Sequence, residues 1–161
     1  MVRDFQTGWR WCLKCQGLFF SSNPNQGICA ADGQSHDASQ SGKYLVNFGE
    51  TQAEKNDRIG STAGQQGDWR WCHKCQGMFF AGHASQGVCP ADQQAHDASL
   101  SGHYSMVLDD SINFIGQRYW RWCQKCQLFF FAGNPDQGAC PAGGPHDATN
   151  SGTYQLRRCE F

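Results

Sequence analysis

Three cysteines and one histidine recur three times along the chain with nearly constant spacing, and this repetition constrains the fold more than any other feature. Each copy has C-x2-C, then thirteen residues, then a third cysteine, and a histidine after six further residues, or five in the last copy. A C-x2-C turn directs two thiolates to one point, and the later pair completes a tetrahedron. The sets are Cys12, Cys15, Cys29, His36; Cys72, Cys75, Cys89, His96; and Cys123, Cys126, Cys140, His146.

Three thiolates and one imidazole form a closed structural zinc site, so the sequence predicts three Zn²⁺ ions per chain. Iron would more naturally take four cysteines. A copy of about 40 residues cannot bury enough apolar surface to fold alone. Zinc binding can supply about 10 kcal/mol or more to such a unit. The metal therefore also explains how so small a unit folds.

Two other uses of the cysteines stay open at this stage. Disulfides are disfavoured because three cysteines per copy cannot pair within the copy, and redox chemistry would leave the third cysteine and the histidine unexplained. Cys159 has no counterpart in the other copies. We expect it to be a free, partly buried thiol, with an intermolecular disulfide as the alternative.

The repetition extends beyond the metal ligands and divides the chain into copies and connectors. The copies occupy residues 1–50, 68–108 and 119–161, and the connectors occupy 51–67 and 109–118. The first connector is polar and rich in Gly and Gln, which predicts an exposed loop. The second can carry a strand around Ile112–Ile115.

Short strands are predicted within each copy. W-R-W alternates, so both tryptophans point to one side, the L-F-F-like segment returns as a second strand, and S-G-x-Y begins a third. The chain is therefore expected to be all-β, with three pseudo-symmetric zinc-ribbon-like repeats packed as one compact domain. Closure could be trefoil-like or prism-like, and it would require the final YQLRRCEF to meet the N-terminal MVRDF.

The run W-R-W-C-x-K-C-Q-x-x-F-F, with a later G-x-C and H-D-x-[ST]-x-S-G-x-Y, resembles cysteine- and tryptophan-rich bacterial repeats to which no role is assigned. The match covers most of the chain apart from the connectors. The C-x2-C element also resembles the knuckle of zinc ribbons. The long spacing from cysteine to histidine departs from the usual short second knuckle of that fold.

Charged residues repeat around each predicted metal site. A lysine inside the C-x-K-C turn would offset the negative charge of zinc with three thiolates. An aspartate after each ligand histidine can cap the next turn, or pair with the arginine between the tryptophans. These residues are Lys14, Lys74 and Lys125; Asp37, Asp97 and Asp147; and Arg10, Arg70 and Arg121.

Aromatic and amide side chains next to the predicted loops indicate a shallow sugar site. An exposed aromatic ring can stack on the C–H face of a sugar while neighbouring amides bond its hydroxyls. Plain turn structure is the competing explanation for each of these residues. The candidate ligand-binding residues are Tyr44, Tyr104, Tyr154, Asn23, Gln26, Gln86, Asn134 and Gln137.

The sequence thus favours a non-enzymatic, zinc-stabilised, lectin-like module with up to three equivalent sites for carbohydrate. The main alternative is a structural protein that self-associates or packs against partner subunits. Nucleic-acid binding is disfavoured because the formal net charge is −1. Catalysis is not predicted, because a closed Cys3His site has no open position and no nucleophile with its base is evident.

The sequence leaves the cellular compartment open. No apolar run approaches the roughly 20 residues needed to span a bilayer. The N-terminus lacks the apolar core of a signal peptide. The cytoplasm is the default expectation, and leaderless export is the alternative.

Overall fold

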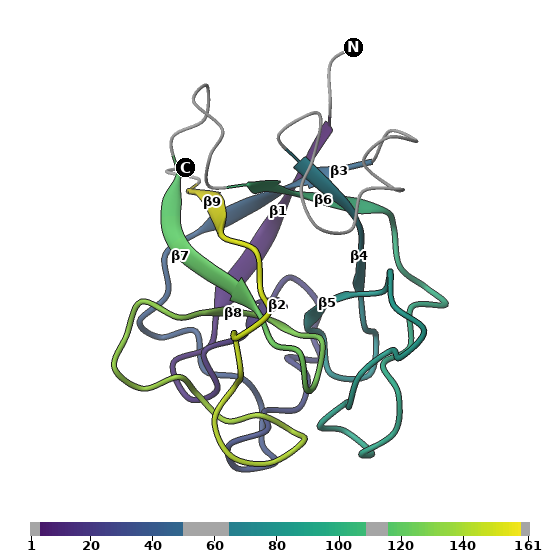
Figure 1. Ribbon diagram of the computed structural model, residues 1–161, viewed down its shortest axis with the longest axis vertical. Helices are drawn as coiled ribbons and strands as arrows, with labels where there is room; N and C mark the ends of the chain where they lie inside the picture. The colour runs from purple at the N-terminus through teal and green to yellow at the C-terminus, as the bar shows by residue number, and fades with distance from the viewer. Residues whose placement is uncertain (1–3, 50–64, 109–115, 159–161) are drawn as a thin grey trace.

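The computed structural model describes residues 4–49, 65–108 and 116–158, and all regular secondary structure within them is β-strand (Figure 1). This confirms the all-β class and the three-repeat organisation. The predicted strand around Ile112–Ile115, Cys159 and most of the first connector lie outside the described residues. The strands are β1 (Asp4–Trp11), β2 (Leu18–Phe20), β3 (Tyr44–Phe48), β4 (Gln65–Trp71), β5 (Met78–Phe80), β6 (Tyr104–Leu108), β7 (Gln117–Trp122), β8 (Phe129–Phe131) and β9 (Tyr154–Arg158).

The first strand of each repeat pairs with both other strands of the same repeat. In the first repeat, the W-R-W end of β1 lies antiparallel to β2, while its N-terminal half lies antiparallel to β3. The register with β3 shifts between Gln6 and Trp9, which marks a β-bulge. Gly8 has a φ of 95° at this bulge. The bulge bends the strand, so one segment serves both a hairpin and the central sheet.

The residue at the bulge differs between the repeats, and the residue at a second, facing position changes with it. A Cβ on Gly8 would lie 2.2 Å from Ser22 Oγ, so the first repeat needs glycine there. Asp68 and Tyr119 take the place of Gly8 in the other repeats, also at positive φ. Gly82 and Gly133 replace Ser22 in those repeats. Each repeat therefore carries a side chain at only one of the two positions.

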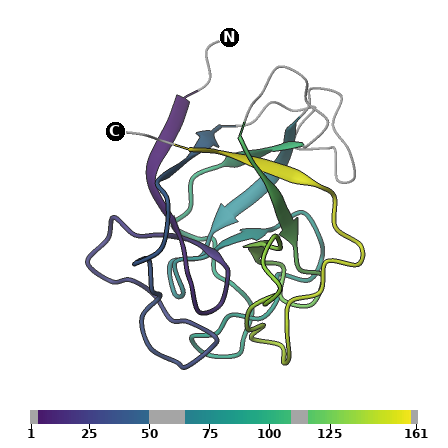
Figure 2. The same cartoon turned by 90° about the vertical axis from the view of Figure 1, so that its left-hand side faces the viewer.

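The third strands of the repeats close the sheet around a pseudo-threefold axis. β3 pairs with β6, β6 with β9, and β9 with β3, which gives a nearly closed, barrel-like sheet (Figures 1 and 2). The sequence suggested that YQLRRCEF would meet MVRDF. Within the described residues, β9 pairs with β3, β6 and β7. β9 and β1 approach each other, since Arg157 Cζ lies 5.1 Å from the ring centroid of Phe5.

A second ring of contacts joins the repeats below the sheet, where the metal-site loops lie in Figure 1. Phe20 N donates to Gln76 O at 2.9 Å, and the same bond runs from the second repeat to the third and from the third to the first. Gly27, with a φ of 80°, packs its Cα against the carbonyl of Cys75. Each repeat is therefore fixed to the next through main-chain atoms.

The core consists of buried aromatic side chains that are shared between repeats. Trp9 is fully buried, and its Nε1 donates to Gln6 Oε1 at 2.9 Å. Tyr104 of the second repeat packs edge-on against Trp9 and donates its hydroxyl to the same Gln6 Oε1 at 2.8 Å. The pattern repeats cyclically, with Trp69, Gln66 and Tyr154, and with Trp120, Gln117 and Tyr44.

No helix in the described part of the chain is long and apolar enough to cross a membrane.

Substitution of Gly27 tests the contact between repeats. Gly27→Ala would place Cβ 2.2 Å from Cys75 O, whereas Gly33 also has a positive φ, of 72°, but a Cβ there would meet nothing within 4 Å. Both changes carry the cost of a left-handed residue, about 1–2 kcal/mol. We expect Gly27→Ala to lower the free energy of unfolding by at least about 2 kcal/mol more than Gly33→Ala. Denaturant unfolding of the metal-loaded protein measures this, and equal losses would contradict close packing at the junction.

Candidate metal centres

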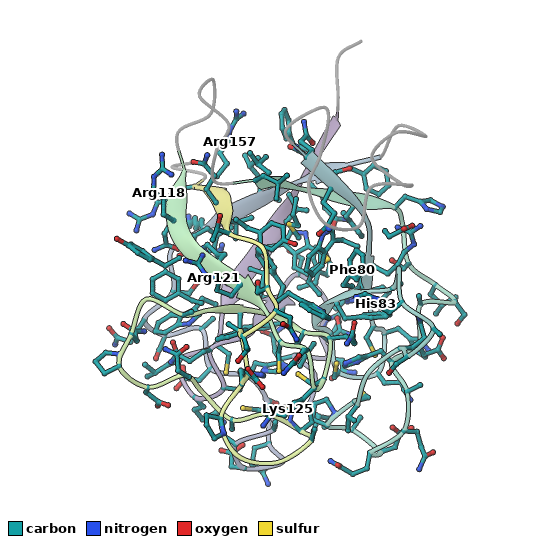
Figure 3. The ribbon with its side chains drawn as sticks, in the orientation of Figure 1. Phe80, His83, Arg118, Arg121, Lys125 and Arg157 are labelled. Carbon is teal, nitrogen blue, oxygen red and sulfur yellow. The ribbon has the colours of Figure 1, made fainter. Side chains whose placement is uncertain are left out.

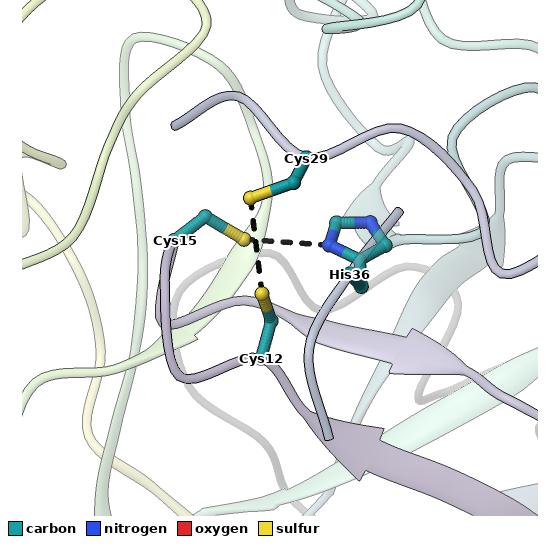
Figure 4. Close-up of side chains that lie close together, drawn as sticks. All are labelled: Cys12, Cys15, Cys29 and His36. Carbon is teal, nitrogen blue, oxygen red and sulfur yellow. Dashed lines mark hydrogen bonds between the residues drawn. The ribbon is translucent and has the colours of Figure 1, made fainter. Parts of the chain in front are cut away.

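Three groups of donor atoms converge in the lower half of the molecule, and they are the three sets that the spacing predicted. In each group one Nδ1 and three Sγ atoms lie within 4.8 Å of one another. Figure 4 shows the first group, with Cys12 and Cys15 on the turn after β1 and with Cys29 and His36 on the following loop. The cysteines are buried.

The spacing of the donors fits a tetrahedral ion and excludes a disulfide. Cys12 Sγ and Cys29 Sγ are 3.8 Å apart, and Cys15 Sγ lies 3.6 Å from His36 Nδ1. Zn–S bonds of about 2.3 Å and Zn–N bonds of about 2.0–2.1 Å place neighbouring donors about 3.8 Å and about 3.6 Å apart. A disulfide would need about 2.05 Å. The nine described cysteines are all free thiols.

Backbone amides stabilise negative charge on the sulfurs. Asp37 N donates to Cys12 Sγ at 3.4 Å, and Ala31 N donates to Cys29 Sγ at 3.4 Å. The first of these bonds recurs in the other two groups. Amides directed at a sulfur favour the thiolate, which is the form that binds a metal.

Each ligand histidine connects its own group to the next repeat. His36 directs Nδ1 toward the sulfurs and donates from Nε2 to Cys75 O at 2.9 Å. His96 donates in the same way to Cys126 O at 3.0 Å, and His146 donates to Cys15 O at 3.1 Å. Metal-bound histidines typically donate their second N–H to such an acceptor, which fixes the tautomer and leaves the other nitrogen for the metal. The three groups therefore form a closed ring.

The donor groups of the first set shift one another's pKa values. Hydrogen bonds from Cys15 and Cys29 lower the pKa of Cys12 well below its usual range, against the effect of burial. The same contacts, with burial, raise the pKa of Cys15. Burial lowers the pKa of His36, but its interactions with Cys12 and Cys29 outweigh burial and bring it to about 9. Cys15 and His36 therefore hold protons that metal binding would release.

The repeated lysine ties the two parts of each site together. Lys14 Nζ lies 2.7 Å from Asp32 Oδ2 and donates to Ser35 O at 2.8 Å, so it clamps the C-x2-C turn to the loop before His36. The pKa of Lys14 is raised mainly by Asp32, with a contribution from the negative charge of Cys29. The sequence predicted that the lysine offsets negative charge at the sulfurs. The structure adds that it fastens the loop.

The repeated aspartate caps a turn, which was one of the two roles considered. Asp37 Oδ1 accepts from Ser39 N at 2.9 Å, and Asp97 and Asp147 cap their turns in the same way. Asp97 also lies 2.8 Å from His73 Nε2.

The arginine between the tryptophans donates to the carbonyl of the tryptophan before it, and Arg70 additionally lies 3.8 Å from Asp68.

The candidate sugar-binding residues are held by internal hydrogen bonds. The three tyrosines are buried, with 3–4% of their surface exposed, and their hydroxyls bond to core glutamines, so the expectation of exposed rings is wrong. Asn23 and Asn134 each bond a glutamine of the next repeat. Gln26, Gln86 and Gln137 each donate from Nε2 to two backbone carbonyls of their own loop. Ligand contact by these residues stays a prediction.

Two cavities lie at equivalent junctions between repeats. The larger encloses about 410 Å³ between the second and third repeats, and Gln66, Phe80, His83, Trp122 and Tyr154 contribute to its walls. Phe80 and His83, both labelled in Figure 3, pack edge-on with ring centroids 5.1 Å apart. The smaller encloses about 280 Å³ between the first and second repeats, and its walls include the equivalents Gln6, Phe20, Asn23, Trp71 and Tyr104.

Sequence reasoning missed these cavities because no single copy contains one. A phenylalanine of one repeat packs edge-on against the second tryptophan of the next, with Phe80 and Trp122 centroids 6.4 Å apart. The second tryptophan of W-R-W is only partly buried, unlike the first. That difference arises at the junction and is invisible in the W-R-W motif itself.

Comparisons with protein-family models, with curated proteins and with solved structures found no match to this chain. The donor sets and their geometry therefore carry the assignment as metal centres.

Metal analysis of the purified chain tests the donor sets. We expect about three zinc ions per chain, because each set supplies a complete tetrahedron. Cys29→Ser should retain about two, because it removes one donor from one set only. Elemental analysis gives the count, and Ser21→Ala, outside the donor sets, is the control. A full set of three ions in Cys29→Ser would contradict this assignment.

The histidine ring predicts that the three sites fill cooperatively. Loading one site orders a histidine that donates to the next site, so titration of chelator-stripped protein with zinc should give a Hill coefficient above one. His36→Cys keeps four donors but lacks the Nε2–H bond to Cys75, and it should lower that coefficient. A competing chromophoric chelator reports occupancy. Three independent sites in the native chain would refute the coupling.

Proposed function

We propose that the protein is a non-enzymatic binding module in which three zinc sites hold the repeats together and the junctions between repeats bind carbohydrate. The observation that carries the proposal is the pair of equivalent cavities at successive junctions. Their size is close to the range of about 300–1,000 Å³ that is usual for small-ligand sites. A ligand site repeated by the symmetry of the chain supports up to three sites per molecule.

The chemistry of the cavity walls supports a sugar. At the junction of the second and third repeats, Trp122 and Phe80 line the cavity with aromatic rings, while Asn150 adds an amide and Ser151 a hydroxyl. Rings suit the C–H face of a sugar, and the polar groups suit its hydroxyls. Three such sites on one molecule would bind a polymer with avidity when its chain can bridge them.

The metal sites support a scaffolding role. Four protein donors complete a tetrahedral zinc site, and the donors are buried beneath the loops. Zinc held there would cross-link segments far apart in sequence, and it would offer no coordination position to a substrate. This is the basis for proposing a binding protein rather than an enzyme.

Assembly with other subunits is a second candidate, and exposed apolar residues favour it. Leu100 is 70% exposed and Phe48 is 40% exposed, and both border the cavity between the first and second repeats. An apolar rim of this kind is also found at protein interfaces. Light scattering of the metal-loaded chain distinguishes assembly from carbohydrate binding. A fixed oligomer that dissociates in Leu100→Asn would favour assembly.

Substitution of Asn150 tests sugar binding without disturbing the core. Asn150 is exposed at the larger cavity, and leucine is the residue at the equivalent position, Leu100. For a saccharide identified on a glycan array, we expect Asn150→Leu to weaken binding at this site by about tenfold, as for a lost hydrogen bond. Tryptophan fluorescence measures it, because Trp122 lines the cavity.

Gln34→Leu is the matched control, since Gln34 is an exposed amide on a loop away from the described cavities. It should bind as the unmodified chain does. Absence of binding to every array glycan at millimolar concentration would remove the carbohydrate proposal.

A further inference from the structure

The junction between the third and first repeats has the same internal frame as the two junctions with cavities. Tyr44 donates its hydroxyl to Gln117 Oε1 at 2.8 Å, as Tyr104 and Tyr154 do at the other junctions. Phe131 packs edge-on against Trp11 with centroids 6.4 Å apart. The pseudo-threefold symmetry therefore extends to this third junction.

The residues around that frame differ in charge between the junctions. Three positions are compared: the residue before the tyrosine, the residue after the core glutamine, and the residue paired with the tyrosine on the neighbouring third strand. At the first junction, between the first and second repeats, they are His103, Thr7 and Phe48. At the second junction, between the second and third repeats, they are Thr153, Gly67 and Leu108. At the third junction they are Lys43, Arg118 and Arg158.

Arg158 lies where the first junction has a cavity wall. It pairs with Tyr44 in the register of β3 and β9, as Phe48 pairs with Tyr104, and Phe48 lines the cavity. Burial raises the pKa of Tyr44, and the charge of Arg158 opposes that rise, which indicates that the guanidinium lies near the phenol. Arg158 is exposed.

Other cations extend the basic surface on this side of the molecule. Lys43 and Arg118 are exposed. Arg118 and Arg157 lie on the same side of the view in Figure 3, away from Phe80 and His83. Since the formal net charge of the chain is −1, this concentration of positive charge is local.

Tyr119 adds an exposed aromatic ring to the same junction. It occupies the bulge position of β7 with a φ of 78°, and it is 58% exposed. Its carbonyl accepts from Ala132 N, directly after Phe131. Because the first repeat has glycine and the second has Asp68 at this position, only the third junction combines an aromatic ring with the three cations.

We propose that the junction of the third and first repeats binds an acidic saccharide, with Arg158, Lys43 and Arg118 facing its carboxylate or sulfate groups and Tyr119 facing a sugar ring. Guanidinium groups suit such oxyanions because their fork of N–H donors can bond two oxygens at once. The inference rests on the proposed carbohydrate function and assigns the ligand class of one site.

Calorimetry on the full metal-loaded chain tests the proposal with matched pairs of probes. The carboxylate pair is an oligogalacturonate and its methyl ester, and the sulfate pair is a heparin oligosaccharide and its desulfated form. We expect at least one acidic member to bind about tenfold more tightly than its neutral partner, in line with one charged hydrogen bond. The difference should shrink in high salt, because exposed charges are screened.

Two double variants locate the effect. Arg158→Phe with Lys43→His installs residues of the first junction and should abolish the acidic preference while neutral binding elsewhere persists. Phe48→Arg with His103→Lys makes the reverse exchange and should create a second acidic site. Circular dichroism and zinc content verify that both variants fold.

The remaining outcomes separate this inference from the proposed function. Neutral saccharides bound without any acidic preference would overturn the inference alone. An acidic preference unchanged in Arg158→Phe with Lys43→His would place the site elsewhere and also overturn it. Binding of a single-stranded RNA homopolymer with no saccharide binding would overturn both in favour of nucleic acid.

Discussion

The convergence of three sulfurs and one imidazole on a single point is the interaction on which the rest of the structure depends. It draws the turn after the first strand of a repeat and the later loop that carries the third cysteine and the histidine into one buried cluster. Most of that loop has no regular secondary structure, so the donors and the lysine clamp hold it in place. The ligand histidine then extends the constraint outward by donating to a carbonyl of the next repeat.

Each repeat is incomplete, and the neighbouring repeat completes it in the same way around the ring. The core tyrosine bonds a glutamine from another repeat, the returning strand bonds a neighbouring main chain, and the loop glycine packs against a neighbouring cysteine carbonyl. This explains how units too small to bury a core alone form one domain. It also explains why the cavities lie between repeats, where two partly filled surfaces meet.

Symmetry fixes the frame of the junctions, and departures from symmetry give each junction its own chemistry. The positions of the candidate metal ligands and of the core are nearly identical in the three copies, because the same geometry must be satisfied three times. Positions at the junction surface vary freely, as the series Gly8, Asp68 and Tyr119 illustrates. The glycine opposite the bulge compensates for that variation, so the surface can change while the strand keeps its path.

The sequence alone determined the metal sets, the number of repeats and the all-β class, because donor spacing and strand alternation are local properties that each copy displays. The role of the aspartates as turn caps was equally local. The burial of the tyrosines, the pairing of the last strand with β3 and the cavities were decided only by tertiary structure. A tyrosine next to a loop looks exposed in one copy, but it is covered by the tryptophan and glutamine of another repeat. Contacts between copies depend on how the ring closes, and no single repeat encodes that closure.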